Sequence, residues 1–152
     1  MDTSMADTPT TSVGPAKRSQ ALRVLLIDDD PLARSILSDA LSANGFEVAQ
    51  AENGREAVRA IVSGKELPNV VLTDLLMPDM DGRTVLALLR LTPGLASVPV
   101  MVVTGSPRAY GLERELEDKG AAAVLDKSWG PATIAEVVSA IVAVSGKQSM
   151  AA

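Results

Sequence analysis

Short apolar runs alternate along this chain with longer amphipathic stretches, and this alternation limits the folds open to it. The runs cover 23–27 (RVLLI), 47–51 (EVAQA), 70–73 (VVLT), 98–104 (VPVMVVT) and 122–125 (AAVL). Most of them are continuously hydrophobic, which is typical of strands that helices cover on both faces. The run at 47–51 alternates instead, so we expect it at an edge of the sheet.

Amphipathic segments at helical spacing separate these runs. They cover 32–43, 54–63, 83–91, 108–119 and 132–144. Asp30 precedes Pro31, which predicts an N-cap followed by proline in the first turn, and Asp81 is expected to cap the third helix. Gly45 and Gly120 follow the first and fourth segments, as expected where helices stop. The pattern predicts an α/β fold: a doubly wound (βα)5 arrangement around a parallel five-stranded sheet.

The two ends of the chain lack this periodicity. Residues 1–20 are rich in Ser, Thr and Pro, and we expect a disordered N-terminal tail there. Residues 146–152 are expected to form a short C-terminal tail. This leaves one domain at 21–145, because 152 residues suit a single core.

Composition excludes several kinds of chemistry. The chain has no Cys and no His, which rules out disulfides, Cys/His zinc sites and His-dependent nucleophiles. Its 14 basic residues do not cluster and its net charge is −5, so we expect no nucleic-acid partner. The sequence predicts neither a membrane span nor a signal peptide, so we expect a cytoplasmic protein.

Polar residues stand at the ends of the predicted strands. Asp28, Asp29 and Asp30 follow the first strand, Asp74 follows the third, Thr104 ends the fourth, and Asp126 and Lys127 follow the fifth. Ligands of open parallel sheets bind outside the carboxyl ends of the strands. The sequence therefore predicts one site at this edge. Asp30 is better explained as a helix cap.

Carboxylates that converge at one edge need either protons or a cation. Mg²⁺ fits best, because it binds one or two carboxylates together with phosphate oxygens and water. Asp74 could then act as a nucleophile that forms an aspartyl phosphate. Such chemistry also needs a hydroxyl and an ammonium to hold the phosphoryl oxygens, and Thr104 and Lys127 supply them.

The chain resembles the receiver domains of bacterial two-component response regulators. The matching segments are VLLIDDDPLAR (24–34), VVLTDLLMPDMDG (70–82), VPVMVVTG (98–105) and AAAVLDK (121–127). The resemblance covers about 21–145 and implies a flavodoxin-like sheet with strand order 2-1-3-4-5. It also implies a stand-alone, single-domain response regulator, a phosphoacceptor protein rather than an enzyme.

The resemblance assigns roles to individual residues. Asp74 would accept a phosphoryl group from a sensor histidine kinase or a histidine phosphotransfer protein. Asp28, Asp29, Asp74 and the main-chain carbonyl of Leu76 would bind Mg²⁺. Thr104 and Lys127 would hold the phosphoryl group. The face formed by the fourth helix, fifth strand and fifth helix would bind a downstream protein. The resemblance leaves open whether the chain also forms a homodimer through that face.

Three positions depart from the usual receiver pattern. Val124 stands where many receivers carry an aromatic residue that couples to the Thr, so a ring-based switch is in doubt. Ser128 replaces the usual proline after the lysine. Trp129 follows it, either as a packed hydrophobic plug or as a partner contact, and burial tendencies favour the packed plug.

Two other functions compete with a phosphorylated switch. A constitutive interaction module would keep the fold without a phosphorylation cycle, in keeping with Val124 and Ser128. A small Mg²⁺-dependent phosphatase would need a second Asp two residues after Asp74, where the chain has Leu76. The phosphatase is therefore disfavoured.

Overall fold

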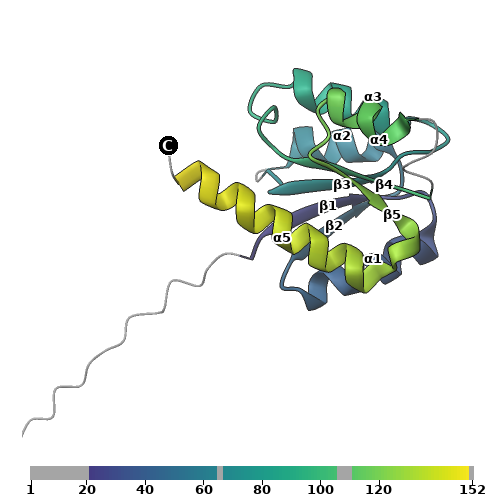
Figure 1. Cartoon of the computed structure of the whole chain (residues 1–152). Coiled ribbons are helices and arrows are strands. Elements are labelled where there is room, and N and C mark those ends of the chain that lie inside the picture. The colour runs from purple at the N-terminus through teal and green to yellow at the C-terminus, as the bar shows by residue number, and fades with distance from the viewer. Residues whose placement is uncertain (1–20, 65–66, 106–110, 151–152) are drawn as a thin grey trace, which may run out of the picture.

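A five-stranded parallel sheet forms the centre of the molecule, with helices on both faces (Figure 1). The computed structural model describes residues 21–64, 67–105 and 111–150. The strands are β1 (Arg23–Ile27), β2 (Glu47–Ala51), β3 (Val70–Asp74), β4 (Val100–Thr104) and β5 (Ala123–Asp126). Their order is β2-β1-β3-β4-β5 and every neighbouring pair is parallel. The predicted fold class and strand order are confirmed.

The helices cover the two faces unequally. They are α1 (Pro31–Ala43), α2 (Gly54–Ser63), α3 (Gly82–Leu91), α4 (Leu112–Asp118) and α5 (Pro131–Met150). A short 3-10 turn, η2 (Lys127–Trp129), joins β5 to α5. Figure 1 shows α2, α3 and α4 on one side of the sheet, with α1 and α5 on the other.

Two aliphatic cores lie on opposite faces of the sheet. Alternate residues of β1 separate between them: Leu25 and Ile27 pack beneath α2, α3 and α4, whereas Val24 and Leu26 pack against α1 and α5. Alternation of side chains along a strand produces this division. The central strands β3 and β4 are buried at every position, which explains their continuous hydrophobicity. The predicted edge strand β2 does lie at an edge.

The predicted helix caps are confirmed. The Asp30 side chain accepts hydrogen bonds from the main-chain N–H groups of Leu32 and Ala33, and Pro31 opens α1. Asp81 accepts from the N–H of Arg83 at the start of α3. Gly45, after α1, has a φ of +89°, which glycine adopts without steric cost. The caps at Asp30 and Asp81 fix where the loops at the carboxyl edge of the sheet end and the helices begin.

Some element boundaries differ from the prediction. β4 begins at Val100 rather than at 98, because the N–H of Val98 donates to the carbonyl of Leu95 in a turn. The expected end of the fifth helix at 144 was too early: α5 runs to Met150, into the segment expected as the 146–152 tail. The predicted N-terminal tail (1–20) and the predicted start of the fourth helix at 108 lie outside the described residues.

None of the helices within the described ranges is long and apolar enough to cross a membrane.

Candidate functional site

The register of the sheet brings the predicted site residues to one edge. Ile27 pairs with Thr73, so the chain continues from β1 into Asp28 at the level of Asp74. Asp74 in turn pairs with Val103, and Thr104 pairs with Asp126. Because each residue advances a strand by about 3.3 Å, Thr104 stands one step beyond Asp74 and Lys127 stands two steps beyond. The polar groups therefore stand progressively farther along the strand direction from β1 to β5.

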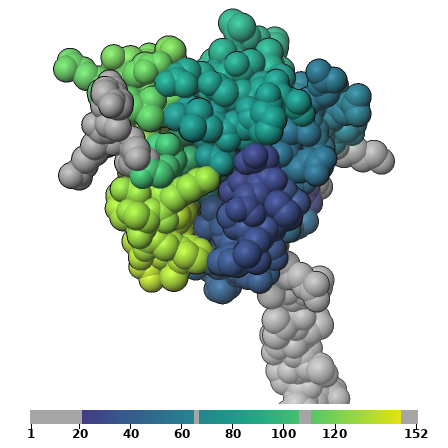
Figure 2. Space-filling model, turned by 90° about the vertical axis from the view of Figure 1, so that its right-hand side faces the viewer, coloured from purple at the N-terminus to yellow at the C-terminus, as the bar shows by residue number. Residues whose placement is uncertain are grey.

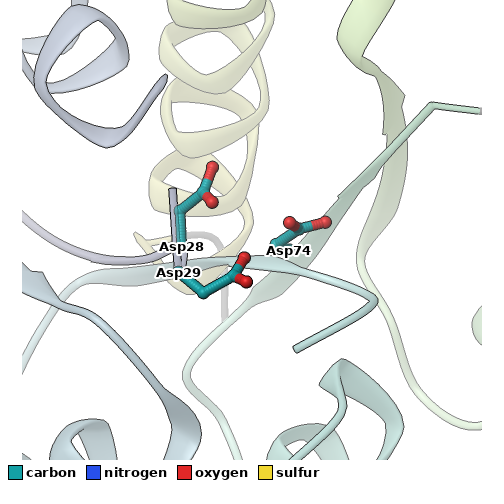
Figure 3. A group of neighbouring side chains, drawn as sticks. All are labelled: Asp28, Asp29 and Asp74. Atoms are coloured by element: carbon teal, nitrogen blue, oxygen red, sulfur yellow. The ribbon is translucent and has the colours of Figure 1, made fainter. Parts of the chain in front are cut away.

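Three carboxylates meet where β1 and β3 end. One oxygen from each of Asp28, Asp29 and Asp74 lies within 4.8 Å of the other two. Figure 3 shows the Asp29 side chain directed toward Asp74, with Asp28 beside them. Asp28 and Asp74 are buried and Asp29 is exposed, so the cluster lies at the protein surface with its inner side away from water.

Burial is the main cause that raises the pKa of Asp28 above its ordinary value, and the negative charges of Asp74 and Asp29 add to the effect. The Asp28 carboxylate accepts a hydrogen bond of 3.0 Å from the main-chain N–H of Asp30, and this contact opposes the rise. Lys127 opposes it as well. The cluster therefore concentrates negative charge that a cation would neutralise.

Lys127 contacts Asp74 directly. Its Nζ lies 2.9 Å from Asp74 Oδ2, and Asp74 Oδ1 accepts a 2.8 Å hydrogen bond from the main-chain N–H of Leu75. Partial burial acts to lower the pKa of Lys127, but the hydrogen bond and charge of Asp74, with the charges of Asp28 and Asp29, outweigh it and raise that pKa. Lys127 thus stays cationic beside the cluster.

A tight turn after β3 fixes the backbone of Asp74. The N–H of Gly82 donates to the carbonyl of Leu75 at 2.7 Å, and a Cβ on Gly82 would lie only 2.7 Å from the main-chain oxygen of Asp74. Thr73 also donates from its hydroxyl to that oxygen, at 2.9 Å. The start of α3 therefore packs against the main chain of the central carboxylate, with no space for a side chain at Gly82.

One residue that holds the cluster in place was not predicted from the sequence. Arg34 on α1 donates from Nη1 to the main-chain oxygen of Asp28 at 2.8 Å, and from Nε to Gln50 at 3.1 Å. It connects the end of β1 to β2. Its position four residues after the capping Asp30 is the only sequence signal, and i to i+4 spacing on a helix is too common to predict such a role.

The positions that depart from the receiver pattern differ in their surroundings. Val124 is buried in the core beneath α2, α3 and α4, so an aliphatic residue occupies the place of the usual aromatic. The packed position favoured for Trp129 is wrong: 45% of this residue is exposed. It ends η2, and Gly130 with a φ of +86° follows it, so the chain turns into α5 before the indole reaches the core.

The donor set fits a hard divalent cation. All three side chains offer carboxylate oxygens that lie close enough to one another to bind a single cation, and the exposed Asp29 leaves the cluster open to solvent. Oxygen ligands with accessible water positions are what Mg²⁺ takes up in proteins. The cluster is an acidic triad of the kind that receivers use for this ion.

Residues 24–139 match the family described as "Response regulator receiver domain". The chain belongs to this family. This is a family of phosphoacceptor signalling domains rather than of conventional enzymes, and membership implies a cognate histidine kinase.

Similar proteins support the assignment. The receiver is 36% identical over 119 residues to a gliding motility regulatory protein of Myxococcus xanthus, covering 78% of this chain and 14% of that protein. It is 38% identical over 101 residues to response regulator MprA of Mycolicibacterium vanbaalenii, covering 64% and 42%. The chain thus spans less than half the length of these curated relatives.

Solved structures show the same fold. The chemotaxis protein CheY4 of Vibrio cholerae has a TM-score of 0.72 at 26% identity, covering 80% of this chain and 98% of that one. A putative response regulator from Chloroflexus aurantiacus has a TM-score of 0.74 at 28% identity, covering 82% and 99%.

Proposed function

We propose that Asp74 is the phosphoacceptor of a Mg²⁺-dependent response regulator. The observation that carries the proposal is the position of Asp74 between the partners that this chemistry needs: Asp28 and Asp29 on one side and the Lys127 ammonium, at 2.9 Å, on the other. The donor would be a phosphohistidine on a sensor histidine kinase or on a histidine phosphotransfer protein.

The transfer would need the phosphohistidine donor, the Asp74 carboxylate and one proton from solvent. An Asp74 carboxylate oxygen attacks phosphorus, an O–P bond forms and the P–N bond to the donor imidazole breaks. The imidazole leaves with the electron pair of that bond and takes a proton from solvent. Mg²⁺, when bound by Asp28, Asp29, Asp74 and the main-chain carbonyl of Leu76, would neutralise charge on the phosphoryl oxygens.

The receiver's own residues prepare this step. The N–H of Leu75 and the ammonium of Lys127 each hold one oxygen of Asp74, which orients the carboxylate before the donor arrives. Once the phosphoryl group is attached, Lys127 would bind one of its oxygens. Thr104, buried at the end of β4, would donate its hydroxyl to another.

The signal would be read by protein binding. Phosphorylation would shift the populations of two conformations of the face formed by α4, β5 and α5, and so change its affinity for a downstream protein or for a second copy. Val124 lies beneath this face, where a β-branched side chain has few rotamers. We therefore expect movement of the backbone rather than rotation of a ring at this position.

Intact-protein mass spectrometry tests the acceptor. The wild-type chain is incubated with acetyl phosphate, a small phosphodonor, with Mg²⁺ or with EDTA. Asp74→Asn removes the proposed acceptor, and Asp79→Asn is the matched control because Asp79 is an exposed carboxylate of the same loop. We expect the mass of one phosphoryl group on the wild type and on Asp79→Asn with Mg²⁺ only.

Two results would contradict the proposal. A phosphoryl mass on Asp74→Asn would move the acceptor to another residue. No phosphoryl mass from acetyl phosphate or from phosphorylated kinase would favour a constitutive interaction module, for which Val124 and Ser128 are the motivating departures.

A further inference from the structure

An apolar cavity of about 230 Å³ lies between α1 and α5, directly beside the proposed phosphorylation site. Ala33, Ile36 and Leu37 of α1 line one wall, and Pro131 and Ile134 of α5 line the other. Asp28, Asp74 and Lys127 stand at its polar end. An enclosed apolar cavity of about 150 Å³ is large enough for benzene, so this one has room for a larger aromatic ring.

The only tryptophan of the chain does not fill this space. The residues that line the cavity include Lys127 and Pro131, and Trp129 lies between these two in the sequence. Within the described part of the chain, its indole is not part of the lining and 45% of the residue is exposed. Figure 2 looks onto the right-hand side of the view in Figure 1, where the starts of α1 and α5 lie next to each other. A large, partly exposed aromatic side chain thus stands in the sequence between two residues that line an apolar space of suitable size.

The two ends of η2 connect this indole to the acidic cluster. Lys127 begins the turn and reaches Asp74 with its ammonium, and Trp129 ends the turn two residues later. Gly130 follows with a φ of +86°, a conformation that allows the chain to change direction there. The ion-paired Lys127 and the indole therefore belong to the same three-residue turn.

We propose that the Lys127–Asp74 ion pair keeps Trp129 outside the cavity, and that its release lets the indole enter. The ion pair fixes the orientation of η2, and burial of the indole favours the inserted state once that restraint is gone. The part of the proposal that makes phosphorylation the trigger rests on the proposed function: a phosphoryl group on Asp74 would take over the ammonium of Lys127.

The inserted indole would change two surfaces at once. It would close the apolar space beside Asp74, and it would remove an exposed aromatic from the loop between β5 and α5. Leu32 and Ile36 of α1 are exposed at the same end of the molecule, so the composition of this surface would depend on the state of Lys127. Loss of the Lys127–Asp74 ion pair would thus change the apolar area exposed at this end of the molecule.

Tryptophan fluorescence with acrylamide quenching tests the proposal. Lys127→Met removes the ammonium, and Lys119→Met is the matched control because Lys119 forms a 3.0 Å ion pair with Glu115 on the far helix α4. We expect the quenching constant of Lys127→Met to fall about two-fold or more, with emission shifted to the blue, because an indole that is 45% exposed becomes buried. Lys119→Met should match the wild type. Circular dichroism checks that each variant is folded.

Filling the cavity tests the destination of the indole. Ala33→Leu adds volume to the cavity wall, and Ala40→Leu adds the same volume elsewhere on α1. In the Lys127→Met background, Ala33→Leu should restore quenching to the wild-type level, whereas Ala40→Leu should not. Equal quenching in the two double variants would overturn the cavity as the destination.

Phosphorylation is measured on the same samples, so the two proposals fail separately. Wild type treated with acetyl phosphate and Mg²⁺ should gain the phosphoryl mass and lose quenching together. A phosphoryl mass without a fluorescence change would overturn phosphorylation as the trigger. No phosphoryl mass would count against the proposed function alone, because Lys127→Met still decides whether the ion pair restrains the indole. Unchanged quenching in Lys127→Met would overturn the inference outright.

Discussion

Gly82→Ala should show how closely the start of α3 supports Asp74. A Cβ at this position would lie 2.7 Å from the main-chain oxygen of Asp74 and 3.1 Å from the Cα of Leu75. Ordinary contact begins near 3.4 Å, so the backbone must separate by about 0.7 Å. Gly105→Ala is the matched control: Gly105 follows Thr104 at the same edge of the sheet, an added Cβ there would meet no atom within 4 Å, and its φ lies outside the left-handed region.

The effects of the two substitutions on the free energy of unfolding should therefore differ in sign or size. Overpacking against rigid groups costs about 1–3 kcal/mol, and replacing glycine by alanine in a helix returns at most about 1 kcal/mol. We expect Gly82→Ala to lower the free energy of unfolding by about 1–2 kcal/mol. Gly105→Ala should change it by less than about 1 kcal/mol, because no neighbouring atom opposes the added Cβ. For a domain of this size, 1 kcal/mol corresponds to about 4 °C in melting temperature.

Urea unfolding and the phosphorylation rate with acetyl phosphate measure the two consequences. The displacement reaches the main chain of Asp74 itself, and a misplacement approaching 1 Å at a reacting group costs up to about 100-fold in rate. We expect the phosphorylation rate of Gly82→Ala to be about ten-fold lower than that of Gly105→Ala. If Gly82→Ala is as stable and as reactive as Gly105→Ala, the close packing of Gly82 on Asp74 does not constrain the acceptor.

Three further predictions concern charge and hydrogen bonding. Because the pKa of Asp28 is raised in the folded state, that state keeps this proton to higher pH than the unfolded chain, so stability in EDTA should fall as pH rises through the raised pKa. Asp28→Asn should lose this fall and exceed the wild type near neutral pH in urea unfolding; a lower stability there would refute the sign. Mg²⁺ at about 100 times its Kd should raise the unfolding free energy of the wild type by about 2.7 kcal/mol, and that of Asp28→Asn by less. Thermal melts with and without EDTA measure this difference. Equal rises in the two proteins would place the ion elsewhere. Arg90 donates to the carbonyls of Ala96, Val98 and Gly120 at 2.8–2.9 Å. Arg90→Lys should therefore lower the free energy of unfolding by about 1–3 kcal/mol, while the exposed control Arg59→Lys should change it by less than about 0.5 kcal/mol. Similar values for both variants would show that the guanidinium contacts contribute little.

Local signals in the sequence were sufficient to predict the α/β fold and its helix caps. β1, β2 and α2 have the predicted boundaries, because continuous apolar runs and the 3.6-residue period are properties of single segments. Asp30 and Asp81 cap helices as predicted, since an N-cap depends on a few neighbouring residues. The meeting of Asp28, Asp29 and Asp74 followed from one rule about the carboxyl ends of parallel strands.

The remaining features depend on contacts between segments that are far apart. Arg34 reaches the carbonyl of Asp28 and Gly82 packs on Asp74, and neither contact leaves a periodic signal in the sequence. Trp129 was expected in the core from the average behaviour of its residue type, but the direction of η2 decides its exposure. The fifth helix extends to Met150 although Gly146, a residue that disfavours helix interiors, lies within it, and this local signal favoured an earlier end.

The aliphatic cores have an optical consequence. Phe46 is the only aromatic residue among the buried core residues described, and the single tryptophan lies outside both cores in η2. Fluorescence of this tryptophan will therefore follow the loop between β5 and α5, and it can change while the sheet stays intact. Far-ultraviolet circular dichroism will follow the helices and the sheet. A denaturation curve measured with both signals thus separates a local event beside Asp74 from the global unfolding of the domain.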